Sequence, residues 1–547
     1  MALKEAELRS WRGSDSASEI TDLRSWIQLL EKEGELRRIK AEVSPEEELG
    51  TIVRKVMAAQ GPALLFENIK GYQKNPLGSK VVSGSLAKYR RIATLLGLSP
   101  ETTNKEMIKA CRDGFKKRLA PVQVGGGPVK ENIIRGRDID LDALPVPRWH
   151  KWDGGRYINT SCSVVTKDPE TGILNVGTYR GMIVPNERNL ISCLLIAAQH
   201  WGIHYSKYKI GRYPMPAAVV IGFDPILRFC AGTPLPAGTN EYEVASAMRG
   251  RPIELVKCET SDLLVPAHAE YVLEGIVSID QKDLRLEGPF GEYTGYYGGA
   301  ASLKPTIRVD CISHRNNPIF EGSLEGFRPG WPNETGTFAS IAFSAMAWNI
   351  LETAGVPGVT DVFTSHLNFA ANIAVQIHKT YRGQAKQAAA ALWASNAAQW
   401  MFKNVTVVEE DIDIHNPEEM EWAYAWRVNA EVGDIEFRPG CHGAPLDPST
   451  RLEERDITKF GSGKWCRVLV DATRNWNFQR WEQWNYSVYP PIQVLENDID
   501  EATKKRWDEY GLSDITYKPV MAIDRDDWLK EYYSLRARPT PEEVTEH

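Results

Sequence analysis

The chain has 547 residues, of which 42% are hydrophobic and 25% charged, and its formal net charge is -7. This length predicts two or three domains, and so mild a charge argues against a dedicated nucleic-acid binder. The longest nearly apolar run, residues 190–198, is too short to cross a bilayer, the first residues lack the apolar core of a signal peptide, and the eight cysteines form no CxxC pair. We therefore expect a cytoplasmic protein without a disulfide framework or a thiolate zinc site.

The first 120 residues read as a small α/β unit. Helical patterns cover residues 20–39 (ITDLRSWIQLLEKEGELRRI) and 45–61 (PEEELGTIVRKVMAAQG), with the short apolar segment ALLFENI at 63–69. We place the end of this N-terminal domain at residue 120.

Short β-like runs dominate the second domain, residues 121–330. They are TSCSVVTKD, ILNVGTYRGMIV, AAVVIGF, PIELVKC and TIRVDCIS. Their density and spacing predict a barrel or a strongly bent sheet. The glycines at 125–127 open neither a GK[ST] nor a GxGxxG motif, so we interpret them as a turn.

Helices and strands alternate in the third domain, residues 331–495. The apolar TFASIAFSAMAWNILETAG precedes VTDVFTS, and the alanine-rich GQAKQAAAALWASNAAQWMF precedes NVTVVEEDID. This alternation predicts an α/β domain. The tail, residues 496–547, is charged and aromatic, and we expect it either to wrap a partner subunit or to be partly disordered.

Two glutamates lie five residues apart in the segment EGPFGEYTGYYGG, residues 287–299. On a regular helix or strand, this spacing would turn Glu287 and Glu292 away from each other, but the glycines and Pro289 make either element improbable. A tight turn would bring both carboxylates into one small space, where burial and charge push their pKa values apart and suit them to proton transfer. A surface turn with two solvated acids is the alternative.

Several other motifs are weak when taken singly. A carboxamide and a guanidinium share the run from Asn175 to Arg180, and a Gln-His pair follows at 199–200. Asn240 is a good N-cap for a helix running from Glu241 to about Arg249, where helix capping alone would explain the acid.

Taken together and in this order, the motifs resemble the UbiD family of flavin-dependent (de)carboxylases. The resemblance rests on Asn-x-Gly-x-Tyr-Arg, Gln-His, TPxP before an acidic helix start, RGxPxELVKC, VPAxAExVLEG, EGPFGEYTGYY, YRGQAK, KNVTVVEEDID and LVDATRNW. It covers residues 20–480. It implies an α/β (α+β) fold with an N-terminal α/β unit, a central split-β-barrel flavin-binding domain and a C-terminal α/β oligomerisation domain.

The resemblance implies prenylated FMN as cofactor, its phosphate held through a divalent metal, usually Mn²⁺, with K⁺ close by. Asn175, His200 and Glu241 match the metal-ligand positions, and an amide oxygen, an imidazole and a carboxylate suit such an ion. The imidazole stays open between His200 and His204. Positions matching the flavin and potassium contacts are Thr178, Tyr179, Arg180, Gln199, His200, Cys230, Ala231, Thr233 and Lys403.

Arg180, Glu287 and Glu292 match the family's catalytic trio. The implied roles are a guanidinium that pairs with Glu287 and holds the substrate carboxylate, and a general acid, Glu292, that protonates carbon once carbon dioxide has left. In the reverse direction Glu292 would act as a base. The expected reaction is therefore reversible, non-oxidative decarboxylation of an aromatic or α,β-unsaturated acid.

The substrate is less constrained. The segment 321–334, with Phe327, Arg328 and Trp331, is expected to line or cover the pocket, which favours an aromatic acid. Residues 86–119 hold nine Lys or Arg against three acids, and this excess suits either a CoA-phosphate site, for a phthaloyl-CoA-type thioester, or a solvated helix face.

A second class of function stays open, a non-catalytic flavin-binding subunit of a carboxylase complex. The presence of the whole Arg-Glu-Glu trio favours the enzyme. The resemblance further implies a homodimer or hexamer assembled through the C-terminal domain, and a flavin prenyltransferase as the source of the cofactor.

Overall fold

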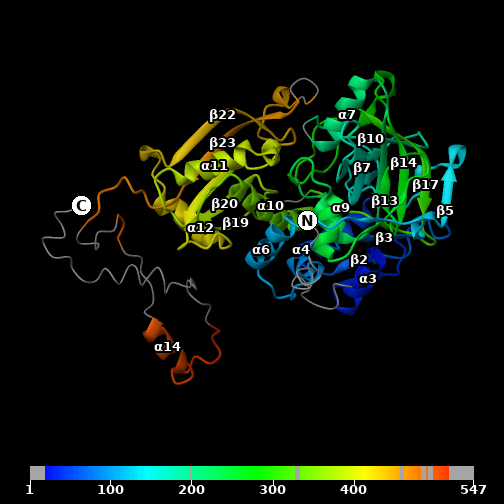
Figure 1. The fold of residues 1–547 in the computed structure, drawn as a ribbon. Coiled ribbons are helices and arrows are strands. Elements are labelled where there is room, and N and C mark those ends of the chain that lie inside the picture. Colours follow the sequence, from blue (N-terminus) through cyan, green and yellow to red (C-terminus); the bar gives the residue numbers. More distant parts are fainter. Residues whose placement is uncertain are drawn as a thin grey trace.

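The computed structural model describes residues 19–197, 199–326, 333–455, 457, 461–481, 488–490 and 497–516. Its three largest sheets are an N-terminal sheet and a central sheet that lie side by side, and a C-terminal sheet that lies apart from both (Figure 1). The predicted pocket residues Phe327, Arg328 and Trp331 fall outside the described residues, as does most of the tail.

The N-terminal unit is a small α/β layer, as predicted. Its elements are α3 (Leu23–Lys32), β1 (Leu36–Ile39), α4 (Glu48–Ala58), β2 (Ala63–Phe66), β3 (Lys80–Ser83), α5 (Tyr89–Leu95) and α6 (Asn104–Gly114). The helical pattern over 20–39 forms a helix only to Lys32. Gly34, at φ +73°, turns the chain into β1, which pairs with β2 in parallel.

The central unit is a curled antiparallel sheet in the order β6-β9-β10-β17-β14-β11-β7-β8, with β5 added on β17. The strands are β5 (Asn132–Arg135), β6 (Tyr157–Asn159), β7 (Cys162–Lys167), β8 (Leu174–Gly177), β9 (Gly181–Ile183), β10 (Leu190–Cys193), β11 (Met215–Ile221), β14 (Tyr271–Val277) and β17 (Thr306–His314).

The connections explain the curl. Thr160 and Ser161 alone join β6, at one edge, to β7, beside the opposite edge, and residues 178–180 join the edge strand β8 to β9. Such short links require the two edges to approach each other. The sheet is therefore a barrel left open between β6 and β8, which confirms the predicted split barrel.

Helices and short strands complete this unit. They are β4 (Val122–Gln123), α7 (His200–Gly211), α8 (Pro225–Ala231), α9 (Glu241–Arg249), β12 (Glu254–Lys257), β13 (Leu264–Pro266), β15 (Arg285–Glu287), β16 (Ser302–Lys304) and β18 (Ile319–Glu321). Helix α9 has the predicted bounds, and the Asn240 side chain caps it by accepting from the Tyr242 N–H. After β17 the chain leaves the barrel, and its next strand, β18, pairs in parallel with β3 of the N-terminal sheet.

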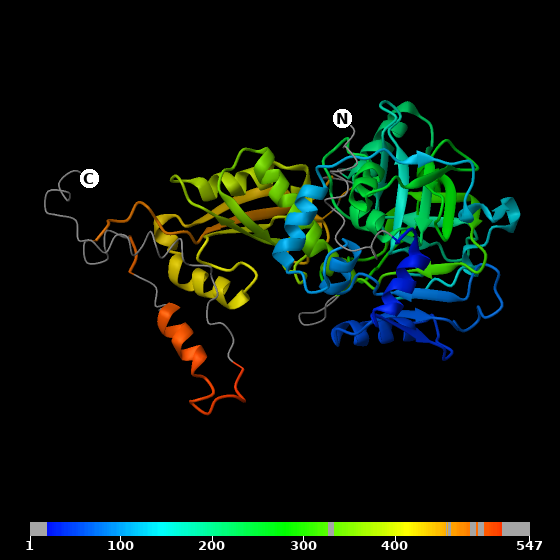
Figure 2. The same cartoon turned by 60° about the horizontal axis from the view of Figure 1, so that its bottom comes forward.

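The C-terminal unit has a five-stranded sheet in the order β19-β20-β21-β23-β22. Its elements are α10 (Glu334–Thr353), β19 (Val359–Phe363), β20 (Asn372–Ile377), α11 (Gln384–Ala394), β21 (Asn404–Glu409), α12 (Pro417–Arg427), β22 (Ile435–Gly443) and β23 (Gly463–Asp471). Helix α14 (Asn497–Lys505), in the tail, lies away from all three sheets (Figures 1 and 2).

Helix α10 joins the units. It is apolar on nearly every side and almost wholly buried, as expected of a central helix. It packs on α5, α6, α8, α11 and β19, so it contacts all three parts of the chain. Among the described residues, no helix has both the length and the apolar character needed to cross a membrane.

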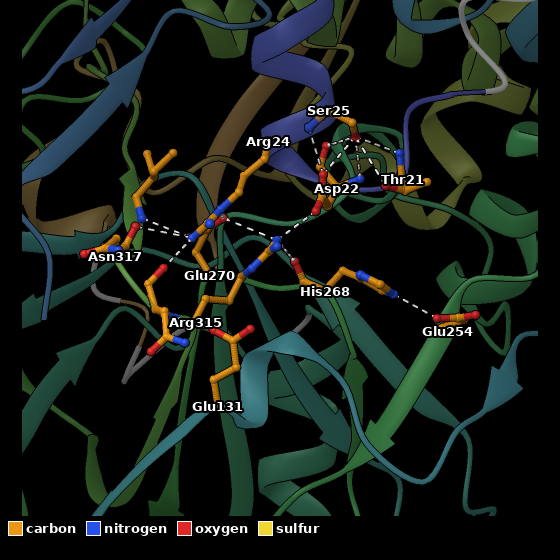
Figure 3. Close-up of polar contacts among 12 residues, drawn as sticks. Thr21, Asp22, Arg24, Ser25, Glu131, Glu254, His268, Glu270, Arg315 and Asn317 are labelled. Carbon is orange, nitrogen blue, oxygen red and sulfur yellow. Dashed lines mark hydrogen bonds and ion pairs between the residues drawn. The ribbon is translucent and has the colours of Figure 1, made fainter. Parts of the chain in front are cut away.

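An ion-pair cluster fastens α3 to the central sheet (Figure 3). The Arg24 guanidinium donates to both oxygens of Glu270, at 2.7 and 2.9 Å, and the Glu270 side chain is fully buried. Beside it, Arg315 donates to Asp22, the N-cap of α3, at 2.7 Å. The cluster thus ties the helix end and the helix face to one end of the neighbouring strands β14 and β17.

Candidate active site

The opening of the barrel forms one wall of a cavity of about 230 Å³. Asn159, at the end of β6, and Thr160, in the β6–β7 link, line it, and residues 175–180 line it from β8 and the β8–β9 link. Side chains from α10 and from the C-terminal unit close it, including Phe338, Phe369 and Trp400. The cavity therefore lies where the central and C-terminal units meet.

Both glutamates of the glycine-rich segment contact one guanidinium inside this region. Arg180 donates from Nη2 to Glu287 Oε2 at 2.9 Å and from Nη1 to Glu292 Oε1. Tyr157 donates its hydroxyl to Glu287 Oε1 at 2.7 Å. Arg180 and Glu292 line the cavity, whereas Glu287 stands behind the guanidinium. The solvated surface turn is therefore excluded, because both carboxylates are buried.

Burial dominates the electrostatics of this trio. It raises the pKa of Glu292, an effect that the charge of Arg180 offsets only in part. Burial by itself would lower the pKa of Arg180, but Glu292 and Glu287 outweigh it and raise that pKa. The arrangement thus holds a permanent cation beside a carboxyl group that keeps its proton more readily than a solvated glutamate does.

Asn175, His200 and Glu241 each line the cavity. Glu241 begins α9, and one of its oxygens accepts from the Val176 N–H at 3.0 Å. Burial raises the pKa of Glu241 to about 8, and no Lys or Arg among the described residues pairs with it. A buried acid without a cation is costly unless a ligand supplies the positive charge.

These three side chains fit a divalent cation. In the described part of the chain, no three His, Cys, Asp or Glu side chains converge on one point. The predicted set includes only two such residues and adds an amide oxygen, a mixture that suits an ion also bound by phosphate oxygens.

The two candidate imidazoles occupy different positions. His200 lines the cavity, whereas His204 does not. The Nδ1 of His204 lies 2.9 Å from the Thr166 hydroxyl, and its Nε2 lies 3.9 Å from Asp168. Burial lowers the pKa of His204 to about 4, which keeps it neutral within a local hydrogen-bond network.

The remaining predicted contacts divide into two groups. Those on the cavity wall are Thr178, Tyr179, Gln199, Ala231 and Thr233. Cys230 is buried with its thiol against Met248, and its carbonyl accepts from the Thr233 N–H at 3.0 Å. Lys403 stands off the wall, donating to Asp447 and Ser449 at 2.7 Å each.

Sequence reasoning missed several lining residues. Asn159 is almost fully buried, and neither its amide nitrogen nor its amide oxygen has a partner. An unsatisfied amide facing a cavity indicates a polar ligand there. Glu325 also lines the cavity, and burial raises its pKa to about 7. No local motif marks Asn159, and Glu325 falls within the segment 321–334 that was expected to line or cover the pocket, although its own role was not singled out.

Three family models match successive parts of the chain between residues 27 and 472. The 3-octaprenyl-4-hydroxybenzoate carboxy-lyase N-terminal domain matches residues 27–111, the Rift-related domain 121–328 and the C-terminal domain 336–472. A phenolic acid decarboxylase of Sedimentibacter hydroxybenzoicus is 34% identical over 83% of this chain and 91% of that protein. An uncharacterized protein of Synechocystis is 32% identical over 91% of this chain and 98% of that protein.

Solved structures of several decarboxylases and UbiD-class enzymes have a fold similar to that of this chain. The closed form of vanillic acid decarboxylase from S. hydroxybenzoicus has a TM-score of 0.77 at 32% identity, over 90% of this chain and 98% of that chain. The UbiD-class enzyme HmfF of Pelotomaculum thermopropionicum, in complex with FMN, has a TM-score of 0.72 at 30% identity, over 88% and 98%. An evolved dimeric form of HmfF, in complex with prenylated FMN, has a TM-score of 0.71 at 28% identity, over 88% and 98%.

Proposed function

Because the chain belongs to the UbiD family of carboxy-lyases, we propose that it releases carbon dioxide from a free aromatic carboxylic acid, using prenylated FMN bound in the cavity. The observation that carries this proposal is the Arg180 guanidinium, held between Glu287 and Glu292 at the cavity wall. Arg180, which can bind an anion, and Glu292, which can hold a proton, are thus neighbours on the wall of a partly apolar cavity. The reaction is chemically reversible, and the same residues serve carboxylation.

Arg180 binds the substrate carboxylate in this proposal. A guanidinium forms paired, charge-assisted hydrogen bonds with a carboxylate, and Glu287 fixes its orientation from behind. The Tyr157 hydroxyl in turn holds Glu287. The substrate carboxylate then displaces the bond between Arg180 and Glu292 and leaves Glu292 free.

Glu292 is the proton donor. Once carbon dioxide has left, the electron-rich carbon needs a proton, and a buried carboxylic acid with a raised pKa supplies it. Burial also excludes water, which would otherwise compete as an unselective proton source. Glu292 therefore combines the right position with the right protonation state.

The cavity residues fit the cofactor. Prenylated FMN, when bound, acts as the electron sink for the carbon that loses carbon dioxide. Asn175, His200 and Glu241 would hold Mn²⁺ or a similar ion at its phosphate, and the unpartnered Asn159 amide offers further hydrogen bonds. Carbonyl groups at Cys230, Ala231 and Thr233 are proposed for K⁺. We assign the remaining contacts to Thr178, Tyr179, Gln199 and Lys403.

The basic stretch gives no support to a CoA thioester. Its cations pair with acids from other parts of the chain: Lys88 and Arg91 with Glu35, Lys105 with Asp361, and Lys116 with Glu352. These three acids offset half of the excess of six positive charges that the sequence suggests. A free acid is therefore the simpler substrate, and the complete catalytic trio argues against a purely structural subunit.

We further propose the domain limits 1–120, 121–330 and 331–495, with the tail at 496–547, and assembly as a homo-oligomer through the C-terminal domain. Exposed aromatic side chains on that domain, such as Trp426 and Phe437, support a contact surface there. A flavin prenyltransferase would supply the cofactor.

The test is a turnover screen. The protein is co-expressed with a flavin prenyltransferase, purified without oxygen, and its cofactor identified by absorbance and mass. Carbon dioxide release is then measured from benzoic, hydroxybenzoic, phthalic and cinnamic acids, free and as CoA thioesters. Release from a free acid supports the proposal. Release from thioesters alone, or purified protein that binds no flavin, contradicts it.

A further inference from the structure

Glu325 is a carboxyl group on the cavity wall that the proposed reaction does not use. It follows β18, and its backbone carbonyl accepts from the His150 Nε2–H at 2.6 Å. The next residue, Gly326, has φ +75°, and a Cβ there would lie 2.8 Å from the Glu292 carbonyl oxygen. Only glycine fits so close to that backbone, so Glu325 is fixed beside the proposed proton donor.

The carboxyl group of Glu325 is held at one oxygen. Thr335, in the first turn of α10, donates its hydroxyl to Oε1. Arg228 is the cation on this part of the wall, but its Nη1 lies 3.0 Å from both Glu321 and Glu334. Within the described ranges, no Lys or Arg forms an ion pair with Glu325, and its second carboxyl oxygen, Oε2, accepts no hydrogen bond.

A ligand that enters this cavity therefore meets a carboxyl oxygen, Oε2 of Glu325, that accepts no hydrogen bond from the described residues. The surrounding wall includes Phe290 and Phe338, which suit an aromatic ring but give no hydrogen bond to an acid. Covering the Glu325 oxygen with bare ring carbon would leave a desolvated, unpaired acceptor, which is unfavourable. A ring substituent that donates a hydrogen bond removes this cost.

The sign of charge adds a second preference. Glu325 is an acid with no cation paired to it among the described residues, so a second carboxylate on the ring would meet another acid there rather than a partner of opposite charge. A hydroxyl group has no such penalty.

We propose that Glu325 is a specificity-determining residue, which accepts a hydrogen bond from a ring hydroxyl of the substrate and so selects hydroxylated aromatic acids over unsubstituted acids and diacids. This inference rests on the proposed function, since it assumes that an aromatic acid occupies the cavity. It assigns Glu325 to substrate recognition and leaves proton transfer to Glu292.

The test compares matched acids on the prenyl-FMN-loaded protein. Dissociation constants and carbon dioxide release are measured for benzoate, 4-hydroxybenzoate, 3,4-dihydroxybenzoate and terephthalate. The variants are Glu325→Gln, which keeps an acceptor oxygen without the charge, and Glu325→Leu, which removes the acceptor. The exposed Glu418→Gln serves as the control for a lost surface charge.

Wild type is expected to bind at least one hydroxylated acid roughly tenfold to hundredfold more tightly than benzoate, the value of one hydrogen bond to a charged group. Glu325→Leu removes this preference, Glu325→Gln keeps most of it and also tightens terephthalate binding, and Glu418→Gln changes neither. The ratio between matched acids is the deciding quantity, because partial misfolding lowers all affinities together.

The inference is overturned by a wild type without preference for any hydroxylated acid, or by a preference that survives in Glu325→Leu. A Glu325→Gln variant that binds every acid normally but turns all of them over slowly also overturns it, because that pattern indicates proton delivery. The proposed function fails separately, if the hydroxyl-dependent binding is present but no acid releases carbon dioxide.

Discussion

At the scale of single residues, the site depends on how one guanidinium and two carboxylates share a buried space. Arg180 contacts both Glu287 and Glu292, but only Glu292 lines the cavity. The two acids thus have unequal access to a substrate, and this inequality gives them different proposed roles. Glu287 orients the cation, and Glu292 reaches the reacting carbon.

Glu292→Gln is expected to lower turnover by roughly 10²–10⁴-fold, since that is the usual contribution of a positioned general acid. The amide keeps the size of the side chain but cannot donate the proton. Flavin content and manganese content should stay at wild-type levels, as measured by absorbance and by elemental analysis. Near-normal turnover in this variant would remove Glu292 from the mechanism.

The pH dependence follows from the raised pKa of Glu292. Its protonated form is the active one, so activity is present below the folded-state pKa and is lost as the pH rises through it. Because burial raises this pKa, we expect the loss well above the ordinary range of a glutamate, about 4.3. Profiles of kcat/KM from about pH 5 to about pH 9 check this. Activity that increases throughout this range would mean that the ionised form is required.

At the scale of elements, prediction from sequence succeeded where local signals decide the structure. Asn240 followed by two acids marks the start of α9, and the structure has this helix at the expected bounds. It failed at residues 36–39, where the helical pattern continues but β1 forms, because pairing with β2 outweighs the local propensity. Asn159 and Trp400 escaped prediction for a related reason, since their role depends on contacts between distant segments.

The pairing of α3 with the barrel gives a stability prediction (Figure 3). Arg24→Met leaves the buried Glu270 carboxylate with fewer donors, and we expect a loss of about 3 kcal/mol in the free energy of unfolding. Urea unfolding, followed by tryptophan fluorescence, measures the shift in midpoint.

A double-mutant cycle separates the pair from general damage. The double variant Arg24→Met/Glu270→Met should be more stable than the sum of the single losses implies, because no uncompensated charge remains. The control is Arg38→Met, whose two partners, Glu31 and Glu67, both keep contact with solvent, and its cost should stay below about 1 kcal/mol. If Arg24→Met and Arg38→Met lowered the free energy of unfolding equally, burial of Glu270 would not increase the cost of removing its partner.

At the scale of the whole molecule, the cavity joins units that are separate in sequence. Barrel residues such as Asn175 form one wall, Phe338 of α10 forms another, and Phe369 and Trp400 come from the C-terminal unit. The packing of α10 on α6 extends this connection to the N-terminal unit. A ligand in the cavity therefore contacts the central and C-terminal units directly and the N-terminal unit through α10.

Cofactor loading is accordingly expected to stabilise all three units together. A ligand that binds only the folded state adds about 4 kcal/mol when present at a thousandfold excess over its dissociation constant. Thermal unfolding should shift upward as one transition on loading with prenylated FMN and Mn²⁺, and hydrogen exchange should slow in β8, in α10 and in the C-terminal sheet. Chelation of the metal should reverse the shift, and Glu241→Gln, which weakens the proposed metal site, should reduce it. If the C-terminal sheet exchanged at the same rate with and without the cofactor, the cavity would not couple the units, and binding would belong to the barrel alone.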